Sequence, residues 1–179
     1  MKTNKTLKLV VTALMAAMAC VATMIIKIPI TATGGYINLG DCIVLLSGVV
    51  LGPLYGGLAA GIGSSLADIF SGYVVYAPAT FVIKSLMAVV VGIFVKRPSA
   101  KIFPTIMISE IISEIIMVAG YFLFEATIMG YGIGAAAALP GNTIQGIVGV
   151  IISMLLIPTI KKLGIDSFRG ISDQSKGAK

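Results

Sequence analysis

Long apolar runs constrain this chain more than any other feature of its sequence. A helix needs about 20 mostly apolar residues to cross the hydrocarbon core of a bilayer. Runs of this kind predict helices over residues 7–26, 38–51, 54–71, 78–95, 102–124 and 141–160. The second and third are divided at "LGPLYGG", because Gly52 permits a turn and Pro53 cannot donate a backbone hydrogen bond.

The composition excludes an ordinary soluble domain. The chain has 179 residues, of which 58% are hydrophobic and 11% are charged. A soluble fold cannot bury so much apolar surface, whereas lipid accepts it without burial. We therefore expect an all-α integral membrane protein, a bundle of six transmembrane helices that forms one domain over residues 1–165. The polar tail, residues 166–179, is expected to be disordered.

The basic residues indicate how the bundle is oriented. Six spans place both termini on one side, and loops rich in Lys and Arg usually face the cytoplasm. The loops of the opposite face carry only Lys27. We therefore expect cytoplasmic N and C termini in a multi-pass protein of a plasma membrane, of bacterial origin. The residues on the cytoplasmic side are Lys2, Lys5, Lys8, Lys96, Arg97, Lys101, Lys161, Lys162 and Arg169.

The first run and the cysteines could suggest processing or metal binding. The run continues to Ile26, which is too long for the apolar part of a secretory signal, so we expect a retained helix. Cys20 and Cys42 form no C-x-x-C pair, and the chain has no histidine. We expect two small buried side chains and no transition-metal site.

Small residues recur at a spacing of four in two of the predicted helices. Gly57 and Gly61 form one such pair, and Ala13 and Ala17 form another in the first helix. This spacing lets membrane helices approach closely, and no phosphate-binding loop of the G-x-x-x-x-G-K-[ST] type is present. For Ala13 and Ala17, either packing inside the bundle or a docking face for another membrane protein fits the pattern.

Polar residues inside the last three predicted helices are the candidates for function. Lys84 interrupts the fourth helix, on one face with Thr80. The fifth carries an acidic and aromatic stripe, "ISEIISEIIMVAGYFLFEA", which includes Glu114 and Tyr121 at helical spacing. The sixth opens with "LPGNTIQG", and its amides Asn142 and Gln145 share one face.

These groups all lie in the outer half of their helices, which predicts one cavity open to the outside. Lys84 would then face Glu114 or a bound ligand. Glu110, deeper in the stripe, could contact a partner, and Glu125 could lie in water at the helix end. Asp41 and Asp68, near the outer ends of the second and third helices, are expected to anchor loops.

Two long stretches carry a family resemblance over nearly the whole chain, to about residue 165. They are "GGYINLGDCIVLLSGVVLGPLYGGLAAGIGSSLADIFSGYVVYAPATFVIKSL" and "EIIMVAGYFLFEATIMGYGIGAAAALPGNTIQG". With them, the chain resembles the S component, the substrate-binding membrane subunit, of energy-coupling factor (ECF) vitamin transporters. Ala13 and Ala17 resemble the family motif that contacts the transmembrane coupling subunit.

The resemblance implies a binding subunit and not an enzyme. Such a subunit captures a vitamin outside, docks on a coupling subunit with two ATPase subunits, and releases its ligand inside. ATP and Mg²⁺ would be used by the partners, with no cofactor in this chain. "YINLGD" and the P-G-N-x-x-Q run are similar to the branch associated with hydroxymethylpyrimidine, a thiamine precursor, and pyridoxine. The residues expected to bind substrate are Tyr36, Lys84, Glu114, Tyr121, Asn142 and Gln145, with the first outer loop around Tyr36 closing over it.

A second hypothesis is a stand-alone secondary transporter of a small heterocycle. Glu110 and Glu114 would then form a proton relay within the membrane. The chain is short and shows no evident inverted repeat, which disfavours this reading. An intramembrane enzyme is not supported, because the sequence shows no nucleophile–base pair. A structural scaffold would not explain the polar stripe.

Overall fold

The computed structural model describes residues 5–96 and 102–162. The predicted tail, residues 166–179, and the basic residues Lys2, Arg97, Lys101 and Arg169 lie outside this range. The helices are α1 (Lys5–Ile25), α2 (Asp41–Phe70), α3 (Ala77–Lys96), α4 (Ile102–Leu123) and α5 (Leu139–Lys162). Two strands, β1 (Lys27–Ile30) and β2 (Gly35–Asn38), and two short helical segments, η1 (Phe124–Ile128) and η2 (Gly132–Ala138), complete the described chain.

Five helical segments of the described chain are long and apolar enough to cross a membrane. The longest, α2, contains the predicted interruption as a sharp reversal. Gly52 has φ 74° and ψ −174°, a conformation that glycine adopts without strain. A Cβ atom added to Gly56 would lie 2.5 Å from the Ser47 carbonyl oxygen, so the second half of α2 folds back along the first. The first half, residues 41–51, is only about 16 Å long and is shorter than a bilayer core.

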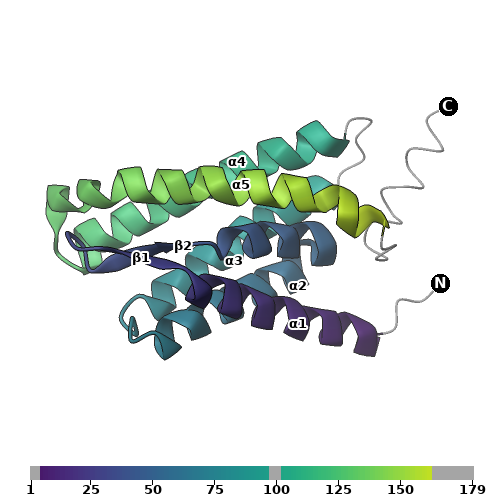
Figure 1. Cartoon of the computed structure of the whole chain (residues 1–179), viewed down its shortest axis with the longest axis horizontal. Helices are drawn as coiled ribbons and strands as arrows, with labels where there is room; N and C mark the ends of the chain where they lie inside the picture. The colour runs from purple at the N-terminus through teal and green to yellow at the C-terminus, as the bar shows by residue number, and fades with distance from the viewer. Residues whose placement is uncertain (1–4, 97–101, 163–179) are drawn as a thin grey trace.

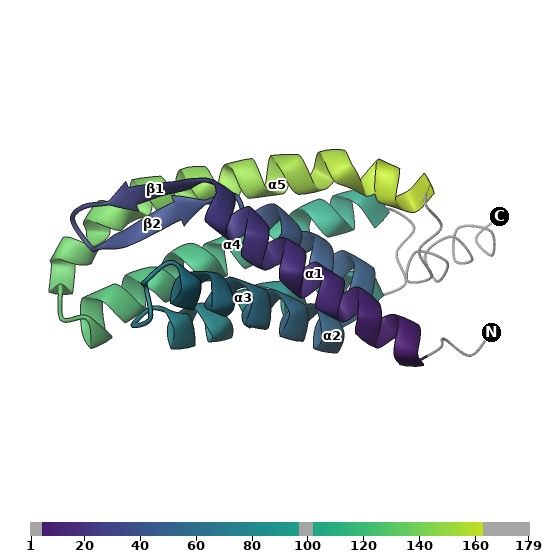
Figure 2. The ribbon, with the colours of Figure 1, turned by 60° about the horizontal axis from the view of Figure 1, so that its bottom comes forward.

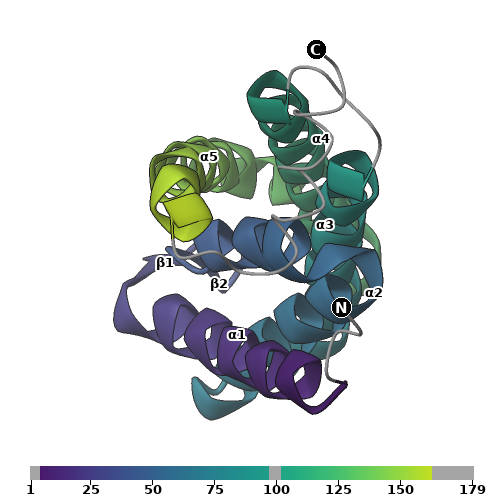
Figure 3. The same cartoon turned by 90° about the vertical axis from the view of Figure 1, so that its right-hand side faces the viewer.

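The helices pack around α2, which supplies half of the buried residues of the hydrophobic core. In the view along the bundle, α1 and α4 lie on opposite sides with α2 and α3 between them (Figure 3). Helix α1 begins and α5 ends at one end of the bundle, which we call the terminal end (Figure 1). The two strands and the α4–α5 connection occupy the other end, which we call the hairpin end.

The connection between α1 and α2, expected to be a loop, is an antiparallel hairpin of β1 and β2. Lys27 pairs with Asn38 and Ile30 pairs with Gly35, and Gly34 takes a positive φ of 70° in the turn. The hairpin lies along the first turns of α5 (Figure 2). A Cβ atom on Gly141 of α5 would lie 3.2 Å from the Ile37 side chain, so glycine permits this close contact. The α4–α5 connection, also expected to be a loop, consists largely of η1 and η2.

The small residues of α2 serve packing against two different neighbours. Gly57 and Gly61 face α3, where an added Cβ on Gly61 would lie 2.9 Å from the Phe81 carbonyl oxygen. Gly63 faces α1, where an added Cβ would lie 2.2 Å from the Ala16 carbonyl oxygen. Close backbone approach of this kind is how small residues join membrane helices.

We therefore expect Gly63→Ala to destabilise the bundle. The new methyl group meets the α1 backbone, which can relieve the contact only by moving away from α2, and overpacking of this kind costs about 1–3 kcal/mol. Thermal unfolding of the detergent-purified protein should show a lower midpoint. Gly134→Ala is the matched control, because a Cβ atom at Gly134 would have no atom of the described residues within 4 Å. Equal midpoints for both variants would contradict this packing account.

Candidate substrate-binding site

Six parts of the fold meet at the hairpin end and enclose a small polar cavity. They are the end of α1, the β hairpin, the end of α2, the first half of α3, the end of α4 with η1, and the start of α5. The cavity has a volume of about 30 Å³. We call it the polar cavity, and its lining residues are Thr23, Ile30, Gly35, Tyr36, Asn38, Ser64, Asp68, Tyr76, Thr80, Lys84, Tyr121, Glu125, Asn142 and Gln145.

Lys84, which lines the polar cavity, forms a buried ion pair with Asp41. Both side chains are almost completely buried, and the Lys84 ammonium contacts Asp41 Oδ1. The second carboxylate oxygen, Oδ2, accepts a hydrogen bond of 2.6 Å from the Gln145 amide. A buried charge pair is tolerated when further hydrogen bonds satisfy its remaining atoms, and Gln145 supplies one.

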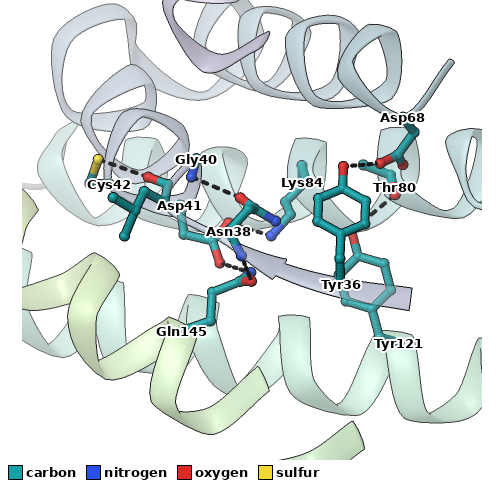
Figure 4. Close-up of polar contacts among 11 residues, drawn as sticks. Tyr36, Asn38, Gly40, Asp41, Cys42, Asp68, Thr80, Lys84, Tyr121 and Gln145 are labelled. Carbon is teal, nitrogen blue, oxygen red and sulfur yellow. Dashed lines mark hydrogen bonds and ion pairs between the residues drawn. The ribbon is translucent and has the colours of Figure 1, made fainter. Parts of the chain in front are cut away.

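The same amide connects the ion pair to the hairpin. Gln145 Oε1 accepts a hydrogen bond of 2.6 Å from the backbone N–H of Asn38, and Asn38 Oδ1 accepts one of 2.8 Å from the Gly40 N–H. Figure 4 shows Gln145 between Asp41 and Asn38. One side chain of α5 therefore positions both the start of α2 and the end of β2.

Tyr36 fastens the middle of the hairpin to the end of α2. Its hydroxyl donates a hydrogen bond of 2.5 Å to Asp68 Oδ1 (Figure 4). Burial, with the negative charge of Asp68 beside it, raises the pKa of Tyr36. The hydroxyl therefore keeps its proton and remains a donor at physiological pH.

Aromatic rings line the cavity next to these charges. The Tyr121 ring centroid lies 5.4 Å from the Lys84 ammonium, and its hydroxyl is 3.0 Å from Thr80 Oγ1. An ammonium at this distance from an aromatic ring is attracted to it. The rings of Tyr36 and Tyr73 are 4.5 Å apart at the rim. Flat rings at these positions offer surfaces on which a planar ligand could stack.

Buried carboxyl groups outnumber buried cations around this end. All five acidic residues of the described chain are between 0% and 7% exposed, namely Asp41, Asp68, Glu110, Glu114 and Glu125. Of those that line the cavity, Asp68 Oδ2 and Glu125 Oε2 have no hydrogen-bond partner among the described residues, and the same holds for Ser64 Oγ. Buried acceptors without partners are costly, so these atoms favour a ligand that donates hydrogen bonds.

Tyr76 holds Glu125 at the edge of the cavity. Its hydroxyl lies 3.1 Å from Glu125 Oε1 and 2.9 Å from the Thr33 carbonyl oxygen, so the proton is shared between two acceptors. Burial and the nearby Glu125 carboxyl raise the pKa of Tyr76, which keeps it a donor. Glu125 is 2% exposed, so the expectation that it lies in water was wrong. The α4 helix continues into η1 here, and this continuation keeps the side chain inside.

The structure brings together five of the six residues expected to bind substrate. Tyr36, Lys84, Tyr121, Asn142 and Gln145 line the polar cavity, and their contact with a ligand stays a prediction. Glu114 does not line it, because it lies about two helical turns from Tyr121 along α4 and contacts the part of α5 at Gly146 and Gly149. The protein partner of Lys84 is accordingly Asp41 and not Glu114.

Sequence reasoning undervalued the two aspartates. Both were expected to anchor loops, and Asp68 does so through Tyr36. In addition, Asp68 lines the cavity, and Asp41 contacts two of its lining residues, Lys84 and Gln145. The sequence feature that could have indicated their role is the presence of an acidic residue at each end of the apolar stretch that forms α2. Because α2 reverses at Gly52, these two ends lie near each other at the hairpin end, and the pairing with Lys84 follows from that reversal.

The fold and the site define a multi-pass membrane protein with an enclosed, acid-rich cavity at one end. A model of the family described as "ECF-type riboflavin transporter, S component" matches residues 3–162. An "Uncharacterized protein in gap 3'region" from Pyrococcus woesei is 39% identical over 142 residues, which is 79% of this chain and 93% of the relative. A solved chain from "Structure and mechanism of the S component of a bacterial ECF transporter" shares the fold with a TM-score of 0.72 at 24% identity, covering 89% of this chain and 98% of its own.

The chain belongs to the family of ECF-type riboflavin transporter S components. S components are the substrate-binding subunits of ECF transporters and are not themselves enzymes. They work with a coupling subunit and ATPases. This membership agrees with the resemblance in the sequence at the level of the S component, and the ligand branch is a separate question.

The ion pair gives a direct test of the site's architecture. Removing one partner leaves an uncompensated buried charge, which costs about 3–5 kcal/mol. We therefore expect Lys84→Met to lower the thermal midpoint strongly. The double variant Asp41→Asn with Lys84→Met removes both charges and should recover a large part of the loss. A single variant as stable as the unmodified protein would contradict the burial of this pair.

Proposed function

We propose that this chain captures a small water-soluble heterocycle on the outer side of the membrane and delivers it inward. In this proposal the coupling subunit and two ATPases, which use ATP and Mg²⁺, drive the transport. The observation that carries the proposal is a set of buried polar atoms without hydrogen-bond partners among the described residues, at Asp68, Glu125 and Ser64, three residues that line one cavity. A ligand rich in hydrogen-bond donors would satisfy them.

The charge balance of the polar cavity restricts the ligand class. Among the lining residues Lys84 is the one cation, and Asp41 already neutralises it. Two carboxyl groups, Asp68 and Glu125, face the same space. This balance disfavours phosphorylated or otherwise anionic ligands and favours neutral or protonated ones.

Hydroxymethylpyrimidine and pyridoxine fit this chemistry. The amino group of the first and the ring and side-chain hydroxyls of the second would donate to the carboxylates. The Asn142 amide is buried in the cavity wall. It could form a hydrogen bond with a ring nitrogen, because an amide side chain both donates and accepts. Tyr36 or Tyr121 would stack on the single ring. The donor requirement, with the resemblance of "YINLGD", supports this pair as the leading candidates.

Riboflavin is the second candidate, because the matching family is described by it. Its ribityl hydroxyls would also donate to carboxylates. Its three fused rings are larger than a pyrimidine or pyridine ring, so it would require more displacement of the surrounding side chains. The two candidates therefore differ in how far the cavity must open.

Any of these ligands needs the polar cavity to expand. A volume of about 30 Å³ holds a water molecule or two but not a ring. The hairpin is the element best placed to move, since it is held over the cavity by Tyr36–Asp68 and Asn38–Gln145. We propose that the hairpin opens for entry and closes over the ligand through these two contacts.

The proposed topology has six membrane segments and cytoplasmic termini. The reversal at Gly52 divides α2 into two segments, which together with the other four helices makes six. Lys5 and Lys8 lie near the start of α1, and Lys96 ends α3, all at the terminal end. The positive-inside rule then places the polar cavity on the outer side.

The exposed alanines of α1 support the docking hypothesis for this helix. Ala16 and Ala19 face α2, whereas Ala13 and Ala17 are exposed. Together with Ile62, Leu66 and Phe70 of α2, they line a groove of about 560 Å³ on the membrane-facing surface. We propose that the coupling subunit packs a helix against Ala13 and Ala17.

Ligand binding to the detergent-purified chain tests the capture function. Calorimetric titration with hydroxymethylpyrimidine, pyridoxine, riboflavin and thiamine should show one tight ligand. Asp68→Asn should weaken it by about tenfold or more, since a hydrogen bond to a charged group contributes about 1.5–3 kcal/mol. Asn142→Ala should weaken it by about two- to tenfold, since a neutral hydrogen bond contributes about 0.5–1.5 kcal/mol. Thr143→Ala, on the exposed side of the same helix turn, should bind normally. Failure of all four ligands to bind would contradict the proposal.

Docking is tested separately by ATP-driven uptake in vesicles that contain the complete transporter. Ala13→Leu with Ala17→Leu should abolish uptake and leave ligand binding unchanged, because the added side chains block close helix approach. Ala137→Leu, an exposed alanine in η2, is the control and should transport normally. Uptake by this chain alone, driven by a pH gradient, would instead support the secondary-transporter hypothesis.

A further inference from the structure

A second hollow lies on the side of the bundle, between α4 and α5. It has a volume of about 660 Å³ and shares no lining residue with the polar cavity. Its walls are apolar, and the isoleucines along its rim, such as Ile115 and Ile147, are more than half exposed. We call it the lateral groove. Its volume falls within the range of small-molecule sites, about 300–1,000 Å³.

One carboxyl group lies at the floor of the lateral groove. Glu114 is 7% exposed, and neither of its carboxyl oxygens has a hydrogen-bond partner among the described residues. The group is accommodated by glycines on α5, since an added Cβ on Gly146 would lie 3.0 Å from Glu114 Oε2. Glu114 and Gly146 both line the groove, so the carboxyl group lies just beneath its floor, and a small outward rotation of the Glu114 side chain would expose a carboxyl oxygen to a ligand. An unsatisfied acceptor in an otherwise apolar pocket determines where a donor would bind.

The position along α4 restricts what can reach this acceptor. Glu114 lies about 18 Å from the start of α4 at Ile102, which is near the middle of a hydrocarbon core about 30 Å thick. A charged lipid headgroup does not reach that depth without great cost. An uncharged molecule with one hydroxyl group does, because it partitions into the bilayer and enters from the side.

We propose that the lateral groove is a binding site for an uncharged lipophilic alcohol or phenol, whose hydroxyl donates to Glu114 and whose apolar part fills the space between α4 and α5. The site is separate from the substrate cavity. Its ligand comes from the lipid phase, whereas the substrate comes from water.

Paired probes test this proposal on the full chain in phosphatidylcholine nanodiscs. Tritiated 4-hexylphenol carries the donor, and 4-hexylanisole has the same apolar body with the donor methylated. Equilibrium binding, corrected with empty nanodiscs, should show one saturable site for the phenol, at least tenfold tighter than for the ether. Equal affinities, or no saturable binding, would overturn the proposal.

Three variants locate the site. Ala119 is an exposed residue of the groove, so the Ala119→Phe variant should fold, and its ring should fill the groove and abolish phenol binding. Ala137 lies outside the groove, so the Ala137→Phe control should bind the phenol normally. Glu114→Leu should reduce the phenol to the affinity of the ether. If Glu114→Leu does not fold, Ala119→Phe decides the matter alone.

A competition experiment separates this site from the substrate site. The vitamin that binds the polar cavity should not displace 4-hexylphenol, and Ala119→Phe should bind that vitamin normally. Displacement of the phenol by the vitamin would overturn the proposal while leaving substrate capture intact. Absence of vitamin binding with intact phenol binding would count only against the proposed function.

Discussion

The buried ion pair of Lys84 with Asp41 is the interaction on which the hairpin end depends. It joins α3 to the start of α2, and through Gln145 it also joins α5 and the hairpin. A charge pair in a membrane bundle is tolerated only when its geometry is good and further hydrogen bonds support it. That requirement fixes where α5 and β2 must lie. The polar cavity is therefore a consequence of how the fold satisfies one charged pair.

The rest of the site is left incompletely satisfied. Asp68 and Glu125 each use one carboxyl oxygen for a contact within the protein, with Tyr36 and Tyr76 respectively. The other oxygen of each has no hydrogen-bond partner in the part of the chain that the structure describes. Leaving a buried acceptor without a hydrogen bond destabilises the ligand-free protein. A ligand with matching donors removes this cost when it binds, so the same acceptors serve to recognise it. The two tyrosines lie on connections at the hairpin end, so ligand recognition and closure of the hairpin involve the same contacts. This coupling is what a capture subunit needs, since binding then favours the closed form.

Much of this could be predicted from the sequence, for physical reasons. Apolar runs of bilayer length are a strong signal, and Gly52–Pro53 marked the reversal in α2 because both residues disfavour a continuous helix. Asn142 and Gln145 were found because amides on one helix face rarely point into lipid. The partner of Lys84 could not be found in this way. Helical periodicity gives the face of a side chain but not the rotation of one helix against another, and so Glu114 and Asp41 could not be distinguished. The hairpin at residues 27–38 was missed because Pro29 and the adjoining glycines are equally typical of a loop.

The central claim is that substrate binds between the hairpin and α3–α5, at the unpartnered acceptors. A crystal structure of the chain with whichever vitamin binds it tests this most directly. The account predicts a planar ring beside Tyr36 or Tyr121, with donors within hydrogen-bond distance of Asp68 Oδ2 and Glu125 Oε2. A vitamin in the lateral groove beside Glu114, or at the terminal end of the bundle, would contradict it.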